Sequence, residues 1–344
     1  MTFTVPTVDI STYVHGGSAS ARAAVASAMD SACSTVGFVQ VLGHGVPDDA
    51  IAGLTSAMDD FFGRSLEEKS AFRMPAEINR GYSPPKSESL SLSIGVQQAN
   101  RMNDFFEAFN VGAAASDFPG LDLPVADYAE NVWPSESFRS RVLPYYREAA
   151  RVARVLTSVF EDALGLEHGF FDDLTDHSVE MLRMNNYALP PGTIDLDGEL
   201  VGMSEHTDFG IVTVLFADQV AGLQVLGTDG SWHDVSPADG ALLVNLGDLT
   251  ARLTNDRWMS TLHRVMPPIV DGTIKRRRSA AFFHDGNIDA LITPLPSCVP
   301  AGSTPRYEPI TVRDNLVAKL SGSRSLQSNA AAVADAARVQ AAAR

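Results

Sequence analysis

The sequence predicts a mainly β protein, an antiparallel sandwich, jelly roll or barrel, packed against a helical N-terminal layer. Three observations lead to this prediction. Many short strand-like segments follow one another between residues 180 and 284, with no helical pattern between them. Turn signals separate these segments at a spacing of roughly 8 to 12 residues, which favours antiparallel pairing over a parallel βαβ sheet. The longer helical patterns all lie before residue 165.

Helix and strand signals alternate at the start of the chain. The segment Val5 to Ile10 should be extended, and the alanine-rich run from Ser18 to Cys33 has helical spacing. A strand is expected over residues 37–42. A second helix is expected to begin near Pro47, with acidic residues next to the positive end of its dipole, and to end at Gly63.

Residues 75–135 behave differently, because they are rich in Pro, Ser, Gly and Asn and show little periodicity. So long an irregular stretch in a compact protein is more often a functional loop or lid than a linker. The longest helical pattern follows, from Ser137 to Leu164, with Gly165 as a stop signal. We expect it to form a scaffold helix.

The strand-like segments of the expected β core are residues 180–187, 210–216, 222–226, 231–235, 241–246, 261–266 and 278–284. A helix is expected over residues 312–320, followed by an alanine-rich tail that would fray. We therefore expect a single domain over residues 1–344. Its parts should be a helical and loop layer over 1–135, a β core carrying the site over 180–290, and the alanine-rich tail over 325–344.

The composition excludes several classes of protein. Forty-two acidic residues against 26 Lys and Arg give a formal charge of −16, which disfavours a nucleic-acid or membrane-surface partner. The two cysteines, Cys33 and Cys298, exclude a disulfide framework and a cysteine-rich zinc site, so a metal would need His and carboxylate ligands. There is no leader-like start and no run of about 18 apolar residues, so we expect a cytoplasmic protein. Its oligomeric state is left open.

The segment from Ser204 to Asp208 places His206 and Asp208 two residues apart. In extended chain such residues point to the same face, so the two side chains can converge on one point. His263, on another expected strand, is a candidate third ligand. Two imidazoles and one carboxylate with open coordination positions form the facial triad of non-haem Fe(II) oxygenases. A His-x-Asp pair is common by chance, however, and a histidine in an apolar strand is more often a core residue.

A basic run follows His263 in the sequence: Lys275-Arg-Arg-Arg-Ser-Ala-Ala-Phe-Phe283. Because side chains alternate across a strand, Arg276 and Arg278 should share one face. The residues expected on the other face are Arg277, Ser279, Ala281 and Phe283. An arginine beside a hydroxyl and two apolar groups suits a small carboxylate, since a guanidinium can bind a carboxylate through two parallel hydrogen bonds.

With these motifs in order, the sequence resembles the isopenicillin-N-synthase-like branch of the iron(II)/2-oxoglutarate-dependent dioxygenases. The resemblance extends over nearly the whole chain. It includes Val5-Pro-Thr-Val-Asp-Ile10, Gly43-His-Gly-Val, Leu182-Arg-Met-Asn-Asn-Tyr187, His206-Thr-Asp208, Thr261-Leu-His-Arg-Val265 and Arg277-Arg-Ser279. It implies a double-stranded β-helix, or jelly-roll, core with flanking α-helices from the N-terminal region and the C-terminus.

The resemblance also implies roles for individual residues. Fe(II) would be bound by His206, Asp208 and His263. The distal carboxylate of 2-oxoglutarate would be bound by Arg277 and Ser279, with Asn185 and Tyr187 nearby. The reaction would use O2 to oxidise an unactivated C–H bond of a small molecule, by hydroxylation, desaturation or cyclisation, with release of succinate and CO2. The candidate substrate contacts are Arg80 and Tyr82 at the start of the irregular loop, and Phe209 and Phe283 as pocket walls.

Two other interpretations stay open. Some members of this family use the same triad and the same Arg-x-Ser pair without 2-oxoglutarate, and bind the carboxylate of the substrate there instead. A catalytically silent jelly-roll protein that binds a metal or small ligand is the third interpretation. The loops that would set specificity, around residues 80–120 and after residue 285, do not indicate which substrate is oxidised.

Overall fold

The larger of two facing sheets has eight strands, and its outer face carries the long helices. The computed structural model describes residues 3–75, 77–95, 104, 106–188, 202–267, 269–270 and 273–323. The strand order is β1-β2-β10-β7-β14-β5-β4-β3, antiparallel except between β1 and β2. Its strands are β1 (Thr7–Asp9), β2 (Phe38–Leu42), β3 (Gly81–Ser83), β4 (Glu107–Gly112), β5 (Glu180–Tyr187), β7 (Val212–Ala217), β10 (Leu242–Leu246) and β14 (Arg277–His284).

A smaller sheet closes the other side of the β core, in the order β6-β11-β8-β9. Its strands are β6 (Met203–His206), β8 (Leu223–Leu226), β9 (Trp232–Asp234) and β11 (His263–Val265). Phe38 and Leu243 of the larger sheet share one buried apolar cluster with Val225 and Val265 of the smaller sheet. Two antiparallel layers around a common apolar interior form the jelly-roll core that was expected. Two short pairs complete the strands: β12 (Ile269–Val270) with β13 (Thr273–Ile274), and β15 (Leu291–Ile292) with β16 (Ile310–Thr311).

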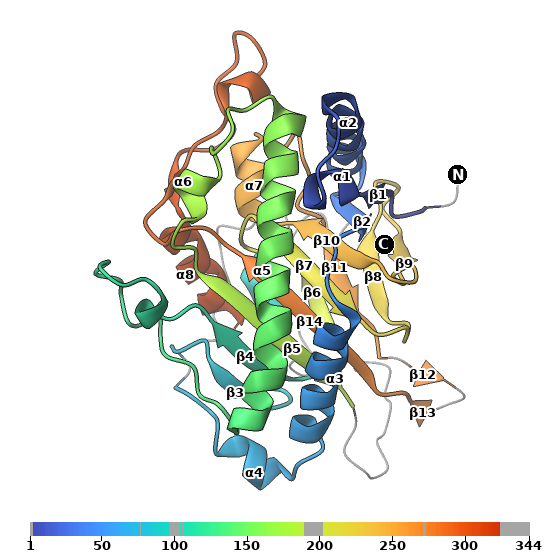
Figure 1. Ribbon diagram of the computed structural model, residues 1–344, viewed down its shortest axis with the longest axis vertical. Helices are drawn as coiled ribbons and strands as arrows, with labels where there is room; N and C mark the ends of the chain where they lie inside the picture. Colours follow the sequence, from blue (N-terminus) through green and yellow to red (C-terminus); the bar gives the residue numbers. More distant parts are fainter. Residues whose placement is uncertain are drawn as a thin grey trace.

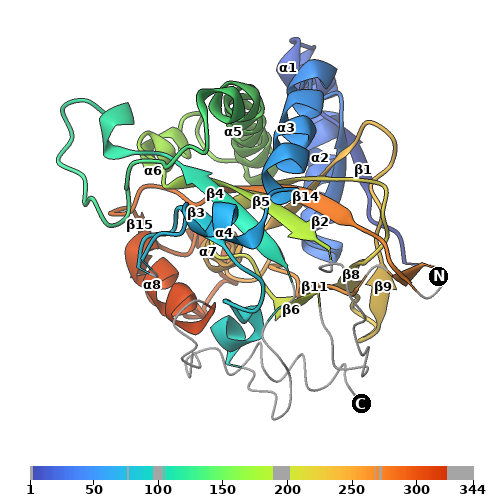
Figure 2. The same ribbon diagram turned by 90° about the horizontal axis from the view of Figure 1, so that it is seen from below.

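Three long helices cover the outer face of the larger sheet (Figures 1 and 2): α2 (Ala19–Thr35), α3 (Asp48–Phe62) and α5 (Glu136–Leu164). Helix α5 begins where the Ser135 side chain accepts a hydrogen bond from the backbone N–H of Phe138. It ends at Gly165, whose φ of 67° is left-handed and therefore favours glycine. Val142 of α5 belongs to the same buried cluster as Phe282 of β14, so α5 is the scaffold helix that its periodicity predicted.

Several short helices connect the larger elements. They are α1 (Ser11–Val14), α4 (Leu66–Ser70), α6 (Asp172–Thr175), α7 (Asp248–Leu253), α8 (Val312–Ser323), and the 3-10 turns η1 (Leu90–Ile94), η2 (Ala115–Asp117) and η3 (Pro296–Cys298). Helix α8 lies beside η1 below the larger sheet in Figure 2, and the backbone N–H of Ser89 donates to the Ser323 carbonyl at 2.9 Å. Among the described residues, no helix combines the length and apolar character needed to cross a membrane.

All seven strands expected between residues 180 and 284 are present, with ends that differ by up to two residues. Two expectations were wrong. The 75–135 stretch is not simply a loop or lid, because it contains β3 and β4, which extend the larger sheet from β5. Helix α7 also interrupts the strand series, between β10 and β11. The alanine-rich tail over 325–344 lies outside the described residues.

The N-terminal layer expected over residues 1–135 contains the two strands that were expected, β1 and β2, and two that were not, β3 and β4. Strands β1 to β4 all come from this region and all join the larger sheet. All six residues of β4 are buried, so the strand lacks the alternation of apolar and polar residues that would reveal it in the sequence.

Candidate metal centre and adjoining cavity

The pairing of β6 with β11 brings two histidines together. His206 and His263 are direct partners in this antiparallel pair, and their ring centroids lie 4.2 Å apart. Asp208 follows β6 by two residues, and its Oδ1 lies 3.9 Å from Nε2 of His206 and 3.7 Å from Nε2 of His263. Within the described part of the chain, these three residues form the only cluster of three or more His, Cys, Asp or Glu that could hold a metal ion.

Hydrogen bonds fix the orientation of all three side chains. Nδ1 of His206 lies 2.7 Å from the Ser204 carbonyl, and Nδ1 of His263 lies 3.1 Å from the Thr261 carbonyl. A ring nitrogen facing a carbonyl must carry the proton, so the Nε2 atoms keep the lone pairs that a metal needs.

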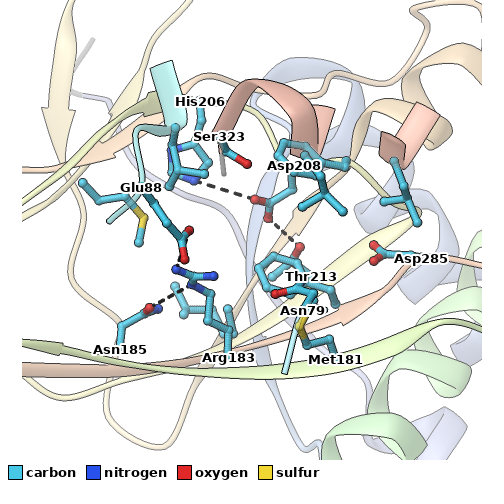
Figure 3. Close-up of a pocket in the computed structure, with 18 of the residues that line it drawn as sticks. Asn79, Glu88, Met181, Arg183, Asn185, His206, Asp208, Thr213, Asp285 and Ser323 are labelled. Atoms are coloured by element: carbon cyan, nitrogen blue, oxygen red, sulfur yellow. Dashed lines mark hydrogen bonds and ion pairs between the residues drawn. The ribbon is translucent and has the colours of Figure 1, made fainter. Parts of the chain in front are cut away.

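Asp208 is held in a similar way. Its Oδ2 accepts hydrogen bonds from the Thr213 hydroxyl and, at 2.6 Å, from the Asn245 amide. Figure 3 shows the Thr213 bond on one carboxylate oxygen of Asp208, while the other oxygen faces His206. One oxygen is thus engaged by the protein, and the other is directed toward the two histidines.

The charge state of this cluster suits metal binding. All three side chains are buried. Burial, together with the neighbouring His263, lowers the pKa of His206 to about 3, so this imidazole is neutral near pH 7. Burial alone would raise the pKa of Asp208. The two histidines and the hydrogen bonds from Thr213 and Asn245 outweigh burial and lower it, so the carboxylate is ionised.

A second group of functional candidates lies along β14 and β5. In the register of these strands, Arg277 is opposite Tyr187 and Ser279 is opposite Asn185, and all four residues line the cavity that also contains the histidines. The predicted alternation along β14 is confirmed. Its inward residues Arg277, Ser279, Ala281 and Phe283 line the cavity, whereas Arg276 and Arg278 both form ion pairs with Asp59 outside it.

The guanidinium of Arg277 is incompletely paired. The residue is 2% exposed, its Nε donates to the Val220 carbonyl at 3.3 Å, and its guanidinium carbon lies 5.1 Å from the centre of the Tyr187 ring. Its NH1 group is buried and has no hydrogen-bond partner among the described residues. A buried cation with an unused donor is costly, so this end of the cavity is suited to an anion.

The substrate contacts expected from the sequence separate into two groups. Arg80, Phe209 and Phe283 line the cavity. Arg80 also donates to the carbonyls of Ala113 (2.7 Å) and Ala129 (3.2 Å), so its guanidinium holds loop backbone in place.

Tyr82 does not line the cavity, so the prediction that it contacts the substrate is wrong. Its side chain is 2% exposed and packs at 5.7 Å from the Phe61 ring, and its hydroxyl donates to Glu107 at 2.6 Å. Tyr82 lies on β3 inside the main core, because the irregular stretch that was expected to form a loop is part of the sheet at this position.

Several further polar residues of the cavity had no role assigned from the sequence, among them Glu88, Arg183, Thr213 and Asp285. Arg183 donates to Glu88 at 2.8 Å and to Asn185 at 3.2 Å (Figure 3). The signal for Arg183 was available, because β5 alternates like β14 and Met181, Arg183, Asn185 and Tyr187 share its inward face. Asp285 likewise continues the alternation of β14 by one more step.

Comparison with known proteins agrees with this geometry. Residues 5–136 match the family model for the N-terminal region of a non-haem dioxygenase in morphine synthesis, and residues 179–286 match the model of the 2OG-Fe(II) oxygenase superfamily. The 2-oxoglutarate-Fe(II) type oxidoreductase hxnY of Emericella nidulans is 35% identical over 317 residues, which cover 90% of this chain and 87% of the relative. Validamycin A dioxygenase of Streptomyces hygroscopicus subsp. limoneus is 31% identical over 314 residues, covering 88% and 82% of the two chains.

Solved structures give the same result. The full-length Neurospora crassa T7H in complex with alpha-KG and thymine superposes with a TM-score of 0.79 at 27% identity, covering 92% of this chain and 96% of that one. A 2OG-Fe(II) oxygenase family protein from Caulobacter crescentus superposes with a TM-score of 0.78 at 27% identity, covering 93% and 99%.

Proposed function

This chain belongs to the 2OG-Fe(II) oxygenase superfamily, and we propose that His206, Asp208 and His263 bind its Fe(II) while Arg277 and Ser279 bind the distal carboxylate of 2-oxoglutarate. It is an Fe(II)- and 2-oxoglutarate-dependent dioxygenase. With Fe(II) bound, the reaction couples oxidation of an unactivated C–H bond to conversion of O2 and 2-oxoglutarate into CO2 and succinate.

The observation that carries the assignment of the 2-oxoglutarate site is the unused NH1 donor of Arg277, in a side chain that is only 2% exposed. A carboxylate at this position would satisfy the donor and neutralise the buried charge. Charge-assisted hydrogen bonds of this kind contribute about 1.5 to 3 kcal/mol each. Ser279 lies two residues along the same face of β14, so its hydroxyl can serve the same carboxylate.

The protein contributes geometry to the reaction. The carbonyls of Ser204 and Thr261 hold the two imidazoles, and Thr213 with Asn245 leaves one oxygen of Asp208 for the metal. Three protein ligands leave coordination positions open for 2-oxoglutarate and O2.

Asn185 and Tyr187 form the neighbouring wall on the 2-oxoglutarate side. The Asn185 side chain is fixed by the hydrogen bond from Arg183, and the Tyr187 ring lies next to the Arg277 guanidinium. The apolar part of the cavity, which includes Phe209 and Phe283, would exclude water around the substrate.

The substrate is inferred to be a small molecule, without a nucleic-acid or membrane partner. One relative is named for an action on validamycin A and another for an action on clavatol, and both are small molecules. The formal charge of −16 also disfavours polyanionic partners. A cytoplasmic location is inferred from the two unpaired cysteines, Cys33 and Cys298, which are typical of a reducing compartment.

Arg277 has a matched control on its own strand, because Arg278 points outward to Asp59. In oxygen-free solution, the visible charge-transfer band of the Fe(II) protein would report 2-oxoglutarate binding. We expect Arg277→Ala to raise the Kd for 2-oxoglutarate by about 10- to 100-fold and Arg278→Ala to leave it within about twofold. Equal effects of the two substitutions would contradict the anchor.

The same titration separates the proposed function from its alternatives. Absence of 2-oxoglutarate binding, together with retained Fe(II) binding, would favour an oxidase that uses the Arg277 site for the carboxylate of its substrate. Failure to bind Fe(II) would favour a non-catalytic ligand-binding protein.

A further inference from the structure

The cavity has a basic side chain at one end of β14 and an acidic side chain at the other. Arg277 begins the strand, and Asp285 is the first residue after it. Asp285 continues the inward alternation of Arg277 and lines the same cavity (Figure 3). Eight residues of extended chain separate the two, which corresponds to roughly 26 Å. The 2-oxoglutarate anchor is therefore at one end of the strand, and a carboxyl group is at the other.

Asp285 has no partner of its own in the described part of the protein. It is 5% exposed, and its carboxyl group makes no hydrogen bond or ion pair there. Gly210 leaves it room, because a side chain at position 210 would collide with Oδ1 of Asp285. Burial, followed by the nearby charges of Asp208 and Glu180, raises the pKa of Asp285 to about 8. A buried carboxyl without a partner is costly to keep, which points to a ligand that supplies the missing partner.

The other charged residues of the cavity lining have partners or assigned roles, except the exposed Glu77. Arg183 forms an ion pair with Glu88. Asp127 lies 3.4 Å from Arg313, which is not part of the cavity lining. Arg80 donates hydrogen bonds to backbone carbonyls. Arg277 is assigned to 2-oxoglutarate, whose two negative charges balance those of Fe(II). Asp208 is assigned to the metal.

Two acids remain in the lining, Glu77 and Asp285. Glu77 is exposed to solvent, whereas Asp285 is buried. Apart from Asp208 at the proposed metal site and the ion-paired Glu88, Asp285 is therefore the buried acid of the lining that has no partner in the described part of the protein.

We propose that Asp285 binds a basic nitrogen of the substrate, so that the substrate class is a small amine with an apolar body. An ammonium group would donate hydrogen bonds to the carboxylate and so stabilise its ionised form in the buried site. The apolar body would contact apolar side chains that line the same cavity, among them Phe209, Phe283, Ile288 and Leu316. A substrate without the basic nitrogen would leave Asp285 desolvated and unpaired, which is the kind of penalty that gives strong discrimination. This inference rests on the proposed function, because the positions of the metal and 2-oxoglutarate define the rest of the cavity.

Three probes that share a benzene ring and differ in their polar group test the inference: benzylamine, benzyl alcohol and benzoate. Each is titrated without oxygen into the full chain loaded with Fe(II) and 2-oxoglutarate, and the change in the visible band gives its Kd. We expect benzylamine to bind at least about tenfold more tightly than the other two. Asp285→Asn should remove this preference, because asparagine keeps the size of the side chain but cannot ionise to pair with an ammonium group. Asp239→Asn, at an exposed position in the turn before β10, should keep it.

The controls make each outcome decisive. Formation of the visible band by the Asp285→Asn protein shows that it is folded, and Asp285→Ser provides a second variant if that protein fails to form it. Equal affinity for the three probes, a preference for benzoate, no binding of benzylamine, or an unchanged preference in the Asp285 variant would each overturn the inference. If the wild-type band does not form at all, the proposed function fails and this inference fails with it.

Discussion

His206 and His263 face each other across the antiparallel pair β6 and β11, with 4.2 Å between their ring centroids. Cross-strand partners in a sheet project to the same side, so pairing alone brings the two imidazoles together. Asp208 completes the cluster because it lies two residues beyond His206. Two strands and one short extension therefore build the site, although 57 residues separate the two histidines in the chain.

The first prediction concerns the metal ligands themselves. We expect Asp208→Ala and His263→Ala to lose Fe(II) binding and turnover, because each removes one of three ligands. His233→Ala is a suitable control, since this ring pairs with Asp229 near the surface. Succinate formation from 2-oxoglutarate and the iron content of the purified protein check both effects. Succinate formation by the Asp208 variant at the wild-type rate would refute the ligand assignment.

The strand alternation explains how much of this site could be predicted from the sequence. The period of two along β14 placed Arg277 inward and Arg278 outward, and the structure confirms both positions. The same period on β5 would have revealed Arg183.

Other features gave no comparable sequence signal. Strand β4 is buried on both faces, so it lacks the alternating pattern, and α7 has only six residues, too few to show helical periodicity. Tyr82 was misassigned because its position in β3 depends on pairing with β4, which local sequence does not reveal. The partners of Asp208 on neighbouring strands likewise depend on the tertiary arrangement.

The second prediction concerns Thr213, which we regard as a positioning residue for Asp208. Thr213→Val keeps the shape of the side chain but removes the hydroxyl that Oδ2 of Asp208 accepts from. We expect the Kd for Fe(II) to rise about tenfold or more, as is usual when a group that orients a metal ligand is lost. Thr213→Ser should restore the affinity because it restores the hydroxyl. Anaerobic Fe(II) titration and thermal melts of both variants check this. A loss of stability without a change in metal affinity would indicate a purely structural role.

The third prediction concerns the attachment of α8 to the metal-binding segment. Nζ of Lys319 lies 2.7 Å from Oδ2 of Asp248, and the backbone N–H of Asp248 donates to the Asp208 carbonyl at 2.8 Å. Lys319→Met would leave the Asp248 carboxylate without this partner in a mostly buried position. Breaking a buried pair on one side costs about 3 to 5 kcal/mol. We expect a loss of this size in the free energy of unfolding, measured by urea denaturation.

The double variant provides the internal control for the Lys319 pair. Lys319→Met combined with Asp248→Asn should lower the free energy of unfolding by less than the sum of the two single substitutions. The second change removes the carboxylate charge that the first change leaves without a partner. Strictly additive effects would show that the 2.7 Å contact contributes no coupling energy.

The last prediction follows from the raised pKa of Asp285, which burial and the charges of Asp208 and Glu180 bring to about 8. The folded protein holds this proton more tightly than the unfolded chain, so the stabilisation is complete below the unfolded pKa near 4 and is lost as the pH rises through about 8. Asparagine does not titrate, so Asp285→Asn should become more stable than the wild type as the pH rises through this range. Above pH 8 we expect a gain on the order of 1 kcal/mol or more, or about 2 °C or more in Tm. Thermal melts from pH 5 to 9 check this prediction, with Asp239→Asn as the control. If the difference in Tm between Asp285→Asn and the wild type does not change with pH, Asp285 does not have the raised pKa described above.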